Sequence, residues 1–285
     1  AGSEMLIQYA DGKFVPIVVA GRDAPGGQWS AAGIPSLFSM NQRGDIAFSA
    51  NATMGGTTDL GTFRWDYQTQ KTTLVAFKGM PAVNNLTFVS GSNGGPTLIN
   101  NSGEIAFAAN VKNAAGATHS GVFLLGQDGQ YQAAALPGQV LPGGATVHEA
   151  FPTGLTDAGV IAFYNLAAGP ANGVYLWEKG TITPVAVVGT QIAGLGKVAS
   201  VGSPAQVNNK DGSVVLPLQL KSASNPWGAY RWVGGQLTPL FIQGQNMQGG
   251  GKLESWLTPL ALNDAGQLAF LGQLIAGPSA AYRMD

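Results

Sequence analysis

The sequence has no cysteine and few charged side chains. The absence of cysteine excludes disulfides, thiolate metal sites and cysteine catalysis. Asp, Glu, Lys and Arg together make up 10% of the residues, against about a quarter in an average protein. The formal net charge is −1 and no dense run of Lys and Arg occurs, so we expect no nucleic-acid partner and no binding to an anionic membrane surface.

Long apolar runs and helical patterns are also missing. No apolar stretch reaches the ~18 residues of a membrane-spanning helix, which predicts that the chain has no transmembrane segment. The opening residues, AGSEMLIQYA, lack a basic region followed by an apolar one, so we expect no signal peptide within them. No stretch repeats apolar residues at i, i+3, i+4 and i+7, and helix should therefore be scarce.

Glycine and proline, in contrast, are abundant, with 42 and 16 residues. Because 45% of the residues are hydrophobic, a core is available and disorder is not expected. Many short strands joined by Gly- and Pro-rich turns have this composition. At 285 residues the chain is long enough for two average domains or one large all-β domain.

One eight-residue pattern occurs five times. It reads NQRGDIAF from Asn41, and it returns in order as NNSGEIAF, TDAGVIAF, NKDGSVVL and NDAGQLAF. Its glycines lie 59, 56, 53 and 54 residues apart by subtraction, at Gly44, Gly103, Gly159, Gly212 and Gly266. This period is close to the ~40–50 residues of a β-propeller blade.

Each repeat carries four strand-like runs. In the third repeat these runs are PTGLTD, GVIAFYN, NGVYLWEKG and TITPVAVVG. They are short, rich in β-branched and aromatic residues, and bounded by Gly, Pro and Asn, which is typical of strands.

The repeated Asn-x-x-Gly predicts a hairpin turn between the first and second strands. The Asn side chain can accept a hydrogen bond from the main chain two residues on, and the Gly supplies the positive φ of a type I turn with a bulge. We expect the small Ala after it to lie where neighbouring sheets pack closely. Calcium binding by these turns is the alternative, but each has too few carboxylates for six to eight oxygen ligands.

The two ends of the sequence complement each other. Residues Lys13–Gly21 read as a fourth strand, and Ala280–Asp285 read as a third strand with no fourth strand after it. We therefore predict an all-β fold, a five-bladed β-propeller with four antiparallel strands per blade, closed by the N-terminal strand completing the last blade. Residues Met5–Gly12 also resemble a third strand, and their place stays open. The prediction is one domain over residues 1–285, with blade cores at about 34–77, 95–136, 151–188, 204–242, and 257–285 plus 13–20.

The repeat resembles the tandem NxxGxxAF repeat of bacterial exported and surface proteins, many of which carry C-terminal sorting anchors. The resemblance covers nearly the whole chain, although the fourth copy lacks Ala-Phe and the third has Thr156 in place of Asn. It implies a secreted, periplasmic or cell-surface β-propeller-like domain. It implies no activity, because that family is largely uncharacterised.

The loops that enter each blade and those between its second and third strands should share one face, opposite the Asn-x-x-Gly turns. These loops differ among the repeats, and variation on one face of a repeat scaffold favours a binding site there. The candidate ligand-binding residues in them are Trp29, Asn85, His119, Lys197, Trp227, Lys252 and Trp256.

The candidate catalytic residues in these loops are His148, Glu149 and Glu254. Glu149 and Glu254 could form the carboxylate pair of a glycoside hydrolase, which needs a separation of about 5–10 Å. His148 and Glu149 could act as an acid and a base or bind a metal, but HEAFP lacks the second His of a zinc helix. No cofactor is expected; a divalent cation would need His119, His148 and a carboxylate.

The leading hypothesis is a non-enzymatic, monomeric binding module with one site for a carbohydrate or cell-surface ligand near the central channel. The loops differ too much for five equivalent sites. A glycosidase-like hydrolase or lyase is the first rival, and a structural surface module without a small ligand is the second.

Overall fold

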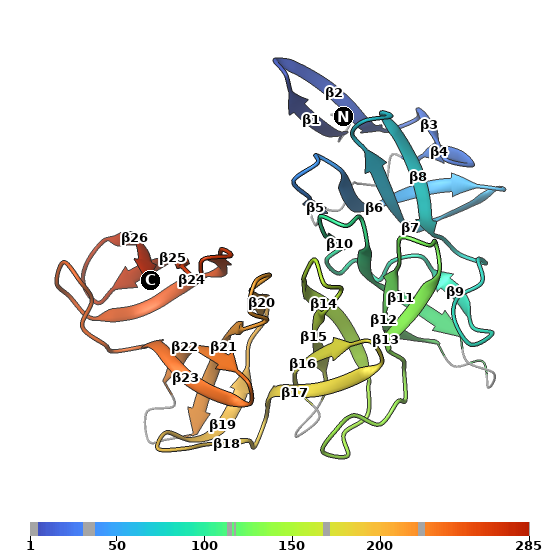
Figure 1. The fold of residues 1–285 in the computed structure, drawn as a ribbon. Coiled ribbons are helices and arrows are strands. Elements are labelled where there is room, and N and C mark those ends of the chain that lie inside the picture. The colour runs from blue at the N-terminus through green and yellow to red at the C-terminus, as the bar shows by residue number, and fades with distance from the viewer. Residues whose placement is uncertain are drawn as a thin grey trace. The chain divides into compact units, whose positions relative to one another are not determined.

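We describe the protein from a computed structural model. The structure describes residues 5–30, 38–112, 116, 118–167, 172–221 and 226–284, and the first residues of the first expected blade core, 34–37, lie outside these ranges. All regular elements in the described residues are β-strands, as Figure 1 shows. The chain divides into two compact units, Ala1–Pro137 with Glu149–Pro152, and Gly138–His148 with Thr153–Asp285.

The first unit contains an N-terminal hairpin and the strands of the first two repeats. The hairpin strands are β1 (Met5–Ala10) and β2 (Lys13–Val19). The first repeat forms a six-stranded sheet of β3 (Asp23–Ala24), β4 (Gly27–Trp29), β5 (Phe38–Met40), β6 (Ile46–Met54), β7 (Thr57–Asp66) and β8 (Lys71–Ala76). The second repeat forms β9 (Thr87–Ser90), β10 (Leu98–Ile99), β11 (Ile105–Lys112), β12 (Thr118–Leu125) and β13 (Tyr131–Ala135).

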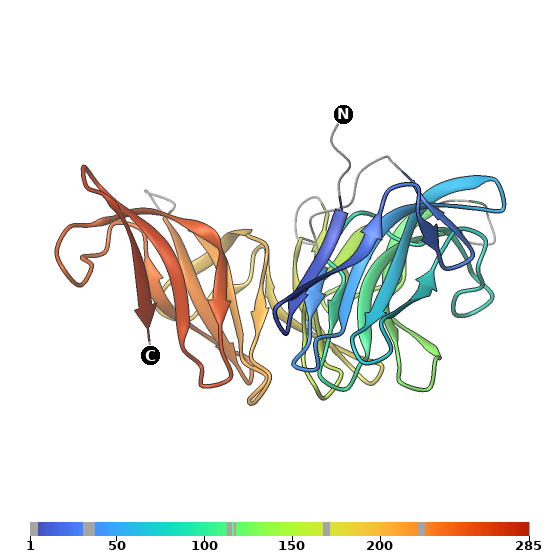
Figure 2. The same ribbon diagram turned by 90° about the horizontal axis from the view of Figure 1, so that it is seen from above.

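The second unit contains most of the strands of the last three repeats. The third repeat begins with β14 (Glu149–Leu155), whose first four residues belong to the first unit, and continues with β15 (Ile161–Leu166), β16 (Gly173–Glu178) and β17 (Thr181–Val187). The fourth repeat has β18 (Gln191–Ile192), β19 (Gly196–Val201), β20 (Gln206–Val207), β21 (Val214–Lys221), β22 (Trp227–Val233) and β23 (Gln236–Ile242). The fifth, red in Figure 2, has β24 (Leu253–Leu262), β25 (Leu268–Leu274) and β26 (Ser279–Met284).

The expected strand order within a repeat is confirmed, with one addition. The first strand is split into two short pieces in three repeats, and both pieces pair with the same second strand. Thus β4 and β5 pair with β6, β9 and β10 pair with β11, and β19 and β20 pair with β21. The break in the first strand matters because residues between β19 and β20 line the site described below.

The Asn-x-x-Gly turn is confirmed in the first repeat. The main-chain N–H of Gly44 donates to Asn41 O at 3.1 Å, and the N–H of Arg43 donates to Asn41 Oδ1 at 3.0 Å. The glycine has a φ of +85°, which a residue with a Cβ adopts only with strain. In the fourth repeat, however, the Asn with this role is Asn208 rather than Asn209, because that turn holds one more residue and Gly212 donates to Asn208 O.

The motif residues also stack their rings in the cores of the sheets. The Phe of Ile-Ala-Phe lies against an aromatic ring of the third strand, with centroid separations of 5.7 Å for Phe48 and Phe63 and 5.5 Å for Phe163 and Tyr175. The preceding Ala47 is fully buried and packs into the core of the second-repeat sheet, as expected. Offset aromatic pairs of this kind add about 0.5–1.5 kcal/mol to the free energy of burial.

The N-terminal hairpin shows how Met5–Gly12 pairs. β1 pairs antiparallel with β2, and Gln8 on β1 donates to Gly44 O at 2.8 Å. Arg231, on the third strand of the fourth repeat, makes the same contact with Gly266 O of the fifth repeat at 2.6 Å. β1 thus contacts the turn of the next repeat as a third strand does, although β26 already holds the third position of the fifth-repeat sheet, and β2 pairs with β1. Pairing of β2 with the fifth-repeat sheet would join the two units, and it stays a prediction.

Candidate functional site

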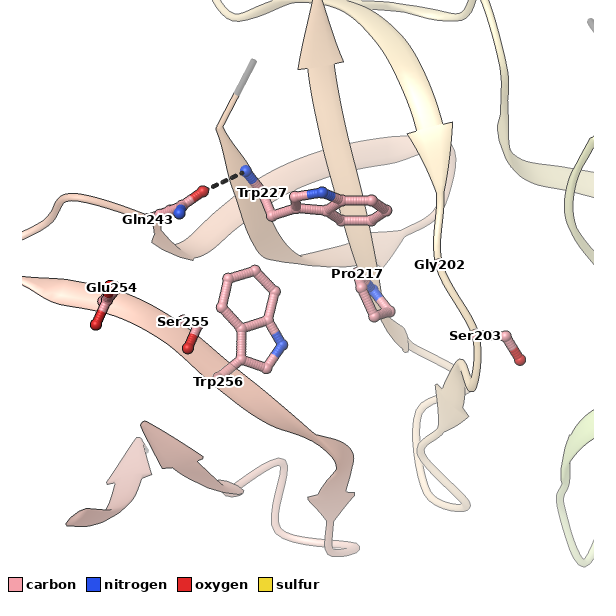
Figure 3. Close-up of a pocket in the computed structure, with 8 residues that line it drawn as sticks. All are labelled: Gly202, Ser203, Pro217, Trp227, Gln243, Glu254, Ser255 and Trp256. Atoms are coloured by element: carbon pink, nitrogen blue, oxygen red, sulfur yellow. Dashed lines mark hydrogen bonds between the residues drawn. The ribbon is translucent and has the colours of Figure 1, made fainter. Parts of the chain in front are cut away.

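A pocket in the second unit gathers eight residues from three strands, β21, β22 and β24, and from the segments that follow β19 and β23. Its volume is about 310 Å³. Figure 3 shows two tryptophan side chains directed into the same space. We call this site the Trp pocket; its lining residues are Gly202, Ser203, Pro217, Trp227, Gln243, Glu254, Ser255 and Trp256.

Trp227 is held by the strands on either side of it. It begins β22, pairs with Gln219 of β21, and is linked to Gln243 by two main-chain contacts: its O accepts from the Gln243 N–H at 2.8 Å, and its N–H donates to Gln243 Oε1 at 3.4 Å (Figure 3). A Cβ on Gly202 would lie 2.9 Å from Pro217 Cβ and 3.3 Å from Trp227 Cζ3. A larger residue at position 202 would therefore crowd Pro217 first and the Trp227 ring less.

Trp256 comes from the neighbouring sheet. It lies on β24 opposite Gly272 of β25, and its ring meets Phe241 edge-on at a centroid separation of 5.1 Å. Both pocket tryptophans are half-buried, so each keeps part of its ring exposed. Neither indole Nε1 donates a hydrogen bond to a described residue, which leaves two N–H donors for a ligand.

The rim of the pocket is polar and carries a single formal charge. Gln243, Glu254 and Ser203 are exposed, while Ser255 is half-buried with its Oγ 3.3 Å from Gln273 Oε1. Pro217 is buried and forms an apolar floor. Apolar and aromatic surfaces with a few polar groups at the edge are typical of sites for small organic ligands.

Three of the predicted site residues meet in this pocket: Trp227, Trp256 and Glu254. The sequence pattern predicts loops at these positions, but Trp227 begins the third strand β22, and Glu254 and Trp256 lie on the first strand β24. Sequence reasoning missed Gly202, Ser203, Pro217, Gln243 and Ser255. The Gly and Ser lie in the break between β19 and β20, where the sequence reads Gly-Ser-Pro.

The prediction for Trp29 needs correction. Its side chain is 3% exposed and packs edge-on against Phe63 at 4.7 Å, within the core of the first-repeat sheet. β4, where Trp29 lies, is an extra strand against β6 rather than a free loop. Its ring is therefore a packing element, and a ligand cannot reach it.

The other predicted residues are exposed and lie outside the Trp pocket. Asn85, His119 and Glu149 belong to the first unit, whereas His148, Lys197 and Lys252 belong to the second. The part of the chain that the structure describes contains no group of three His, Asp or Glu side chains placed to hold a metal ion. Glu149 and Glu254 lie in different units, so their pairing stays a prediction.

A larger hollow of about 720 Å³ also lies in the second unit. It is lined by β17, β23 and the turn before β19, together with Trp232. No lining residue is charged, and most of the lining comes from consecutive residues of β17, of the turn before β19 and of β23. It holds one tryptophan, whereas the Trp pocket brings two tryptophans and a carboxylate together, so we take the Trp pocket as the candidate site.

The sequence belongs to a family of unknown function, DUF7453, which it matches over residues 2–280. No curated protein matches the chain. Within the described residues, no helix is long and apolar enough to cross a membrane.

Several solved structures are similar to this chain. TolB from Acinetobacter baumannii is 11% identical with a TM-score of 0.50, over 95% of this chain and 54% of that one, so the chain spans about half the length of that protein. The β-propeller domain of the trilobed protease from Pyrococcus furiosus is 11% identical with a TM-score of 0.39, over 99% and 90%. A Hadza microbial sialidase, Hz136, is 13% identical with a TM-score of 0.41, over 82% and 49%. At these identities the likeness shows the fold alone.

Proposed function

We propose that the protein is a binding module that holds a carbohydrate in the Trp pocket. The observation that carries the proposal is the meeting of Trp227 and Trp256 in one pocket, with both indole N–H groups unused by the described residues. The C–H faces of a sugar ring pack on aromatic rings, while its hydroxyl groups accept from N–H donors and bond to the Gln243, Ser203 and Ser255 side chains.

Binding is favoured over hydrolysis by the number of carboxylates. Glycoside hydrolysis uses two, about 5–10 Å apart, and Glu254 is the single carboxylate among the lining residues. The rival reading, a hydrolase using His148, Glu149 and Glu254, is tested by the double variant Glu149→Gln, Glu254→Gln. Unchanged turnover of a glycan by that variant would exclude a mechanism that depends on these carboxylates.

The test of binding is a glycan array followed by titration of tryptophan fluorescence. We expect a glycan that changes the indole emission, and we expect Trp227→Ala and Trp256→Ala each to weaken its binding at least about tenfold, equivalent to ~1.4 kcal/mol. Trp232→Ala is the matched control, because Trp232 is half-buried on the same strand β22 and lies outside the Trp pocket. Ser203→Tyr, at an exposed rim position, blocks the pocket without removing a packed ring.

Equal loss of binding in Trp232→Ala and Trp227→Ala would contradict the assignment of the site. A complete lack of glycan binding would favour the remaining alternative, a structural surface module without a small ligand.

We further propose that the protein acts outside the cytoplasm, as the resemblance to bacterial proteins with NxxGxxAF repeats implies. Labelling of intact cells with a membrane-impermeant amine reagent tests this location, since exposed lysines such as Lys197 and Lys252 would react. Labelling only after cell lysis would contradict it.

The fold proposal is a ring of five blades in which β2 supplies the fourth strand of the fifth blade and β1 is an additional strand beside it. It is supported by the contact of Gln8 with the turn of the first repeat and by the fifth sheet, whose described strands are β24, β25 and β26. The experiment that tests closure is given in the Discussion.

A further inference from the structure

The electrostatics of the Trp pocket are set by one side chain. Glu254 is its only charged lining residue, and the other seven are apolar or uncharged. Glu254 is exposed at the start of β24, and it makes no ion pair with any residue that the structure describes. The carboxylate is thus available to a ligand in the pocket rather than committed to a protein cation.

Because of this single negative charge, acidic sugars should bind in the pocket more weakly than uncharged sugars. A carboxylate on the ligand would meet a like charge and would find no Lys or Arg among the lining residues to replace its lost hydration. An uncharged sugar ring meets no like-charge repulsion and has no charged group to dehydrate. Its hydroxyl groups can donate hydrogen bonds to the Glu254 carboxylate. Charge-assisted hydrogen bonds of that type are stronger than those between neutral groups.

The size of the pocket limits how much of a glycan can enter. Its volume of about 310 Å³ is at the lower end of the ~300–1,000 Å³ found for small-molecule sites. Such a volume suits the end of a glycan chain better than its interior, which would need an open groove.

We propose, building on the proposed carbohydrate site, that the Trp pocket takes the uncharged pyranose end of a glycan and that Glu254 rejects acidic sugars. Glu254 is then a specificity-determining residue. Because it is exposed, solvent weakens the effect, and we expect discrimination of about twofold to fivefold between ligands that differ only by one carboxylate.

The test uses matched pairs of methyl glycosides, each a hexose and its uronic acid: glucose with glucuronic acid, galactose with galacturonic acid and mannose with mannuronic acid. Dissociation constants are measured by tryptophan fluorescence at pH 7 and low salt. In the wild-type protein the hexose should bind about twofold to fivefold more tightly than its uronic acid. This ratio should shrink at high salt, which screens exposed charges.

Glu254→Gln removes the charge and keeps the shape of the side chain. It should bring the ratio close to one, mainly by improving binding of the uronic acid. Glu178→Gln is the matched control, since Glu178 is exposed on β16 outside the pocket, and it should leave the ratio as in the wild type.

Three outcomes overturn the inference. Tighter or equal binding of the uronic acid by the wild type excludes rejection of acids, and an unchanged ratio in Glu254→Gln excludes this residue as its cause. In both cases loss of hexose binding in Trp227→Ala would show that the proposed function stands. If no member of any pair binds, the proposed function and this inference fail together.

Discussion

The Asn208 side-chain Nδ2 donates a hydrogen bond to the main-chain O of Asn263, 2.9 Å away in the next repeat. The same bond joins Asn41 to Asn100 O at 3.0 Å in the first unit. Asn41 and Asn208 each accept hydrogen bonds from N–H groups of their own turn through Oδ1, and each donates a hydrogen bond to the neighbouring repeat through Nδ2. In these two repeats the Asn side chain therefore links neighbouring sheets as well as closing its own hairpin.

Asn208→Ala should lower the free energy of unfolding by about 1–3 kcal/mol. The side chain is 2% exposed, and its loss leaves the N–H groups of Lys210 and Asp211 and the O of Asn263 without their partner. Denaturant unfolding measures the change. Asn263→Ala is the control, because this exposed Asn closes its own turn and its main-chain O remains; we expect about 0.5–1 kcal/mol. Equal effects in the two variants would contradict a role for Asn208 between the sheets.

Asp45 should make stability depend on acid pH. Burial alone would raise the pKa of this carboxyl, but the main-chain N–H of Tyr67 and the amide of Asn41 outweigh it. The Arg64 and Arg43 guanidinium groups, 3.1 and 2.8 Å away, act in the same direction, and the pKa of Asp45 lies below its usual value. A lowered pKa in the folded state gives stability that is present above the unfolded value of about 3.9 and is lost as the pH falls through the folded value.

The measurement for Asp45 is the unfolding free energy of wild type and Asp45→Asn between pH 7 and pH 2. The variant should be less stable by about 1–3 kcal/mol at pH 7, and the difference should shrink below about pH 4. Asp66→Asn is the control, since Asp66 is 32% exposed and 3.6 Å from Arg64; its effect should stay below about 1 kcal/mol. A gap between wild type and Asp45→Asn that is constant with pH would exclude the linkage.

Tyr230→Phe should leave stability unchanged or raise it by up to about 1 kcal/mol. The ring is fully buried, its hydroxyl has no hydrogen-bond partner within the described structure, and burial raises the pKa of this phenol. An unpaired buried hydroxyl is unfavourable, and the matching third-strand positions in the first two repeats hold Phe63 and Phe123. Thermal unfolding tests the change. A loss above about 1 kcal/mol would instead show that the hydroxyl is satisfied, for example by a buried water.

The sequence was sufficient to predict the second and third strands of each repeat and the hairpin turns, because period, β-branched runs and Asn-x-x-Gly act locally. It placed Trp29 and Lys197 in loops, whereas they lie on β4 and β19. It misplaced the fourth turn by one residue, since Asn208 and Asn209 are adjacent and only the bonds to Gly212 and Asn263 distinguish them. Trp29 and Trp227 look alike as loop aromatics, but packing against β6 buries the first and leaves the second exposed in part. No sequence pattern indicated Gln243 as a site residue, because its place beside Trp227 depends on the pairing of β22 with β23.

Ring closure can be tested directly because the chain has no cysteine. Single cysteines replacing Phe14 on β2 and Ala281 on β26, both exposed, allow two spin labels to be attached without a background. If β1 and β2 complete the fifth sheet, the distance distribution should be short and narrow; a long or broad one would contradict closure. Deleting residues 1–20 should then lower the free energy of unfolding by several kcal/mol, about 1.5–3 for each large apolar side chain removed from the core, including Leu6, Ile17 and Val18. An unchanged melting temperature would show that the hairpin contributes nothing to the hydrophobic core. If the labels are close but the melting temperature is unchanged, the hairpin lies against the fifth sheet without stabilising it.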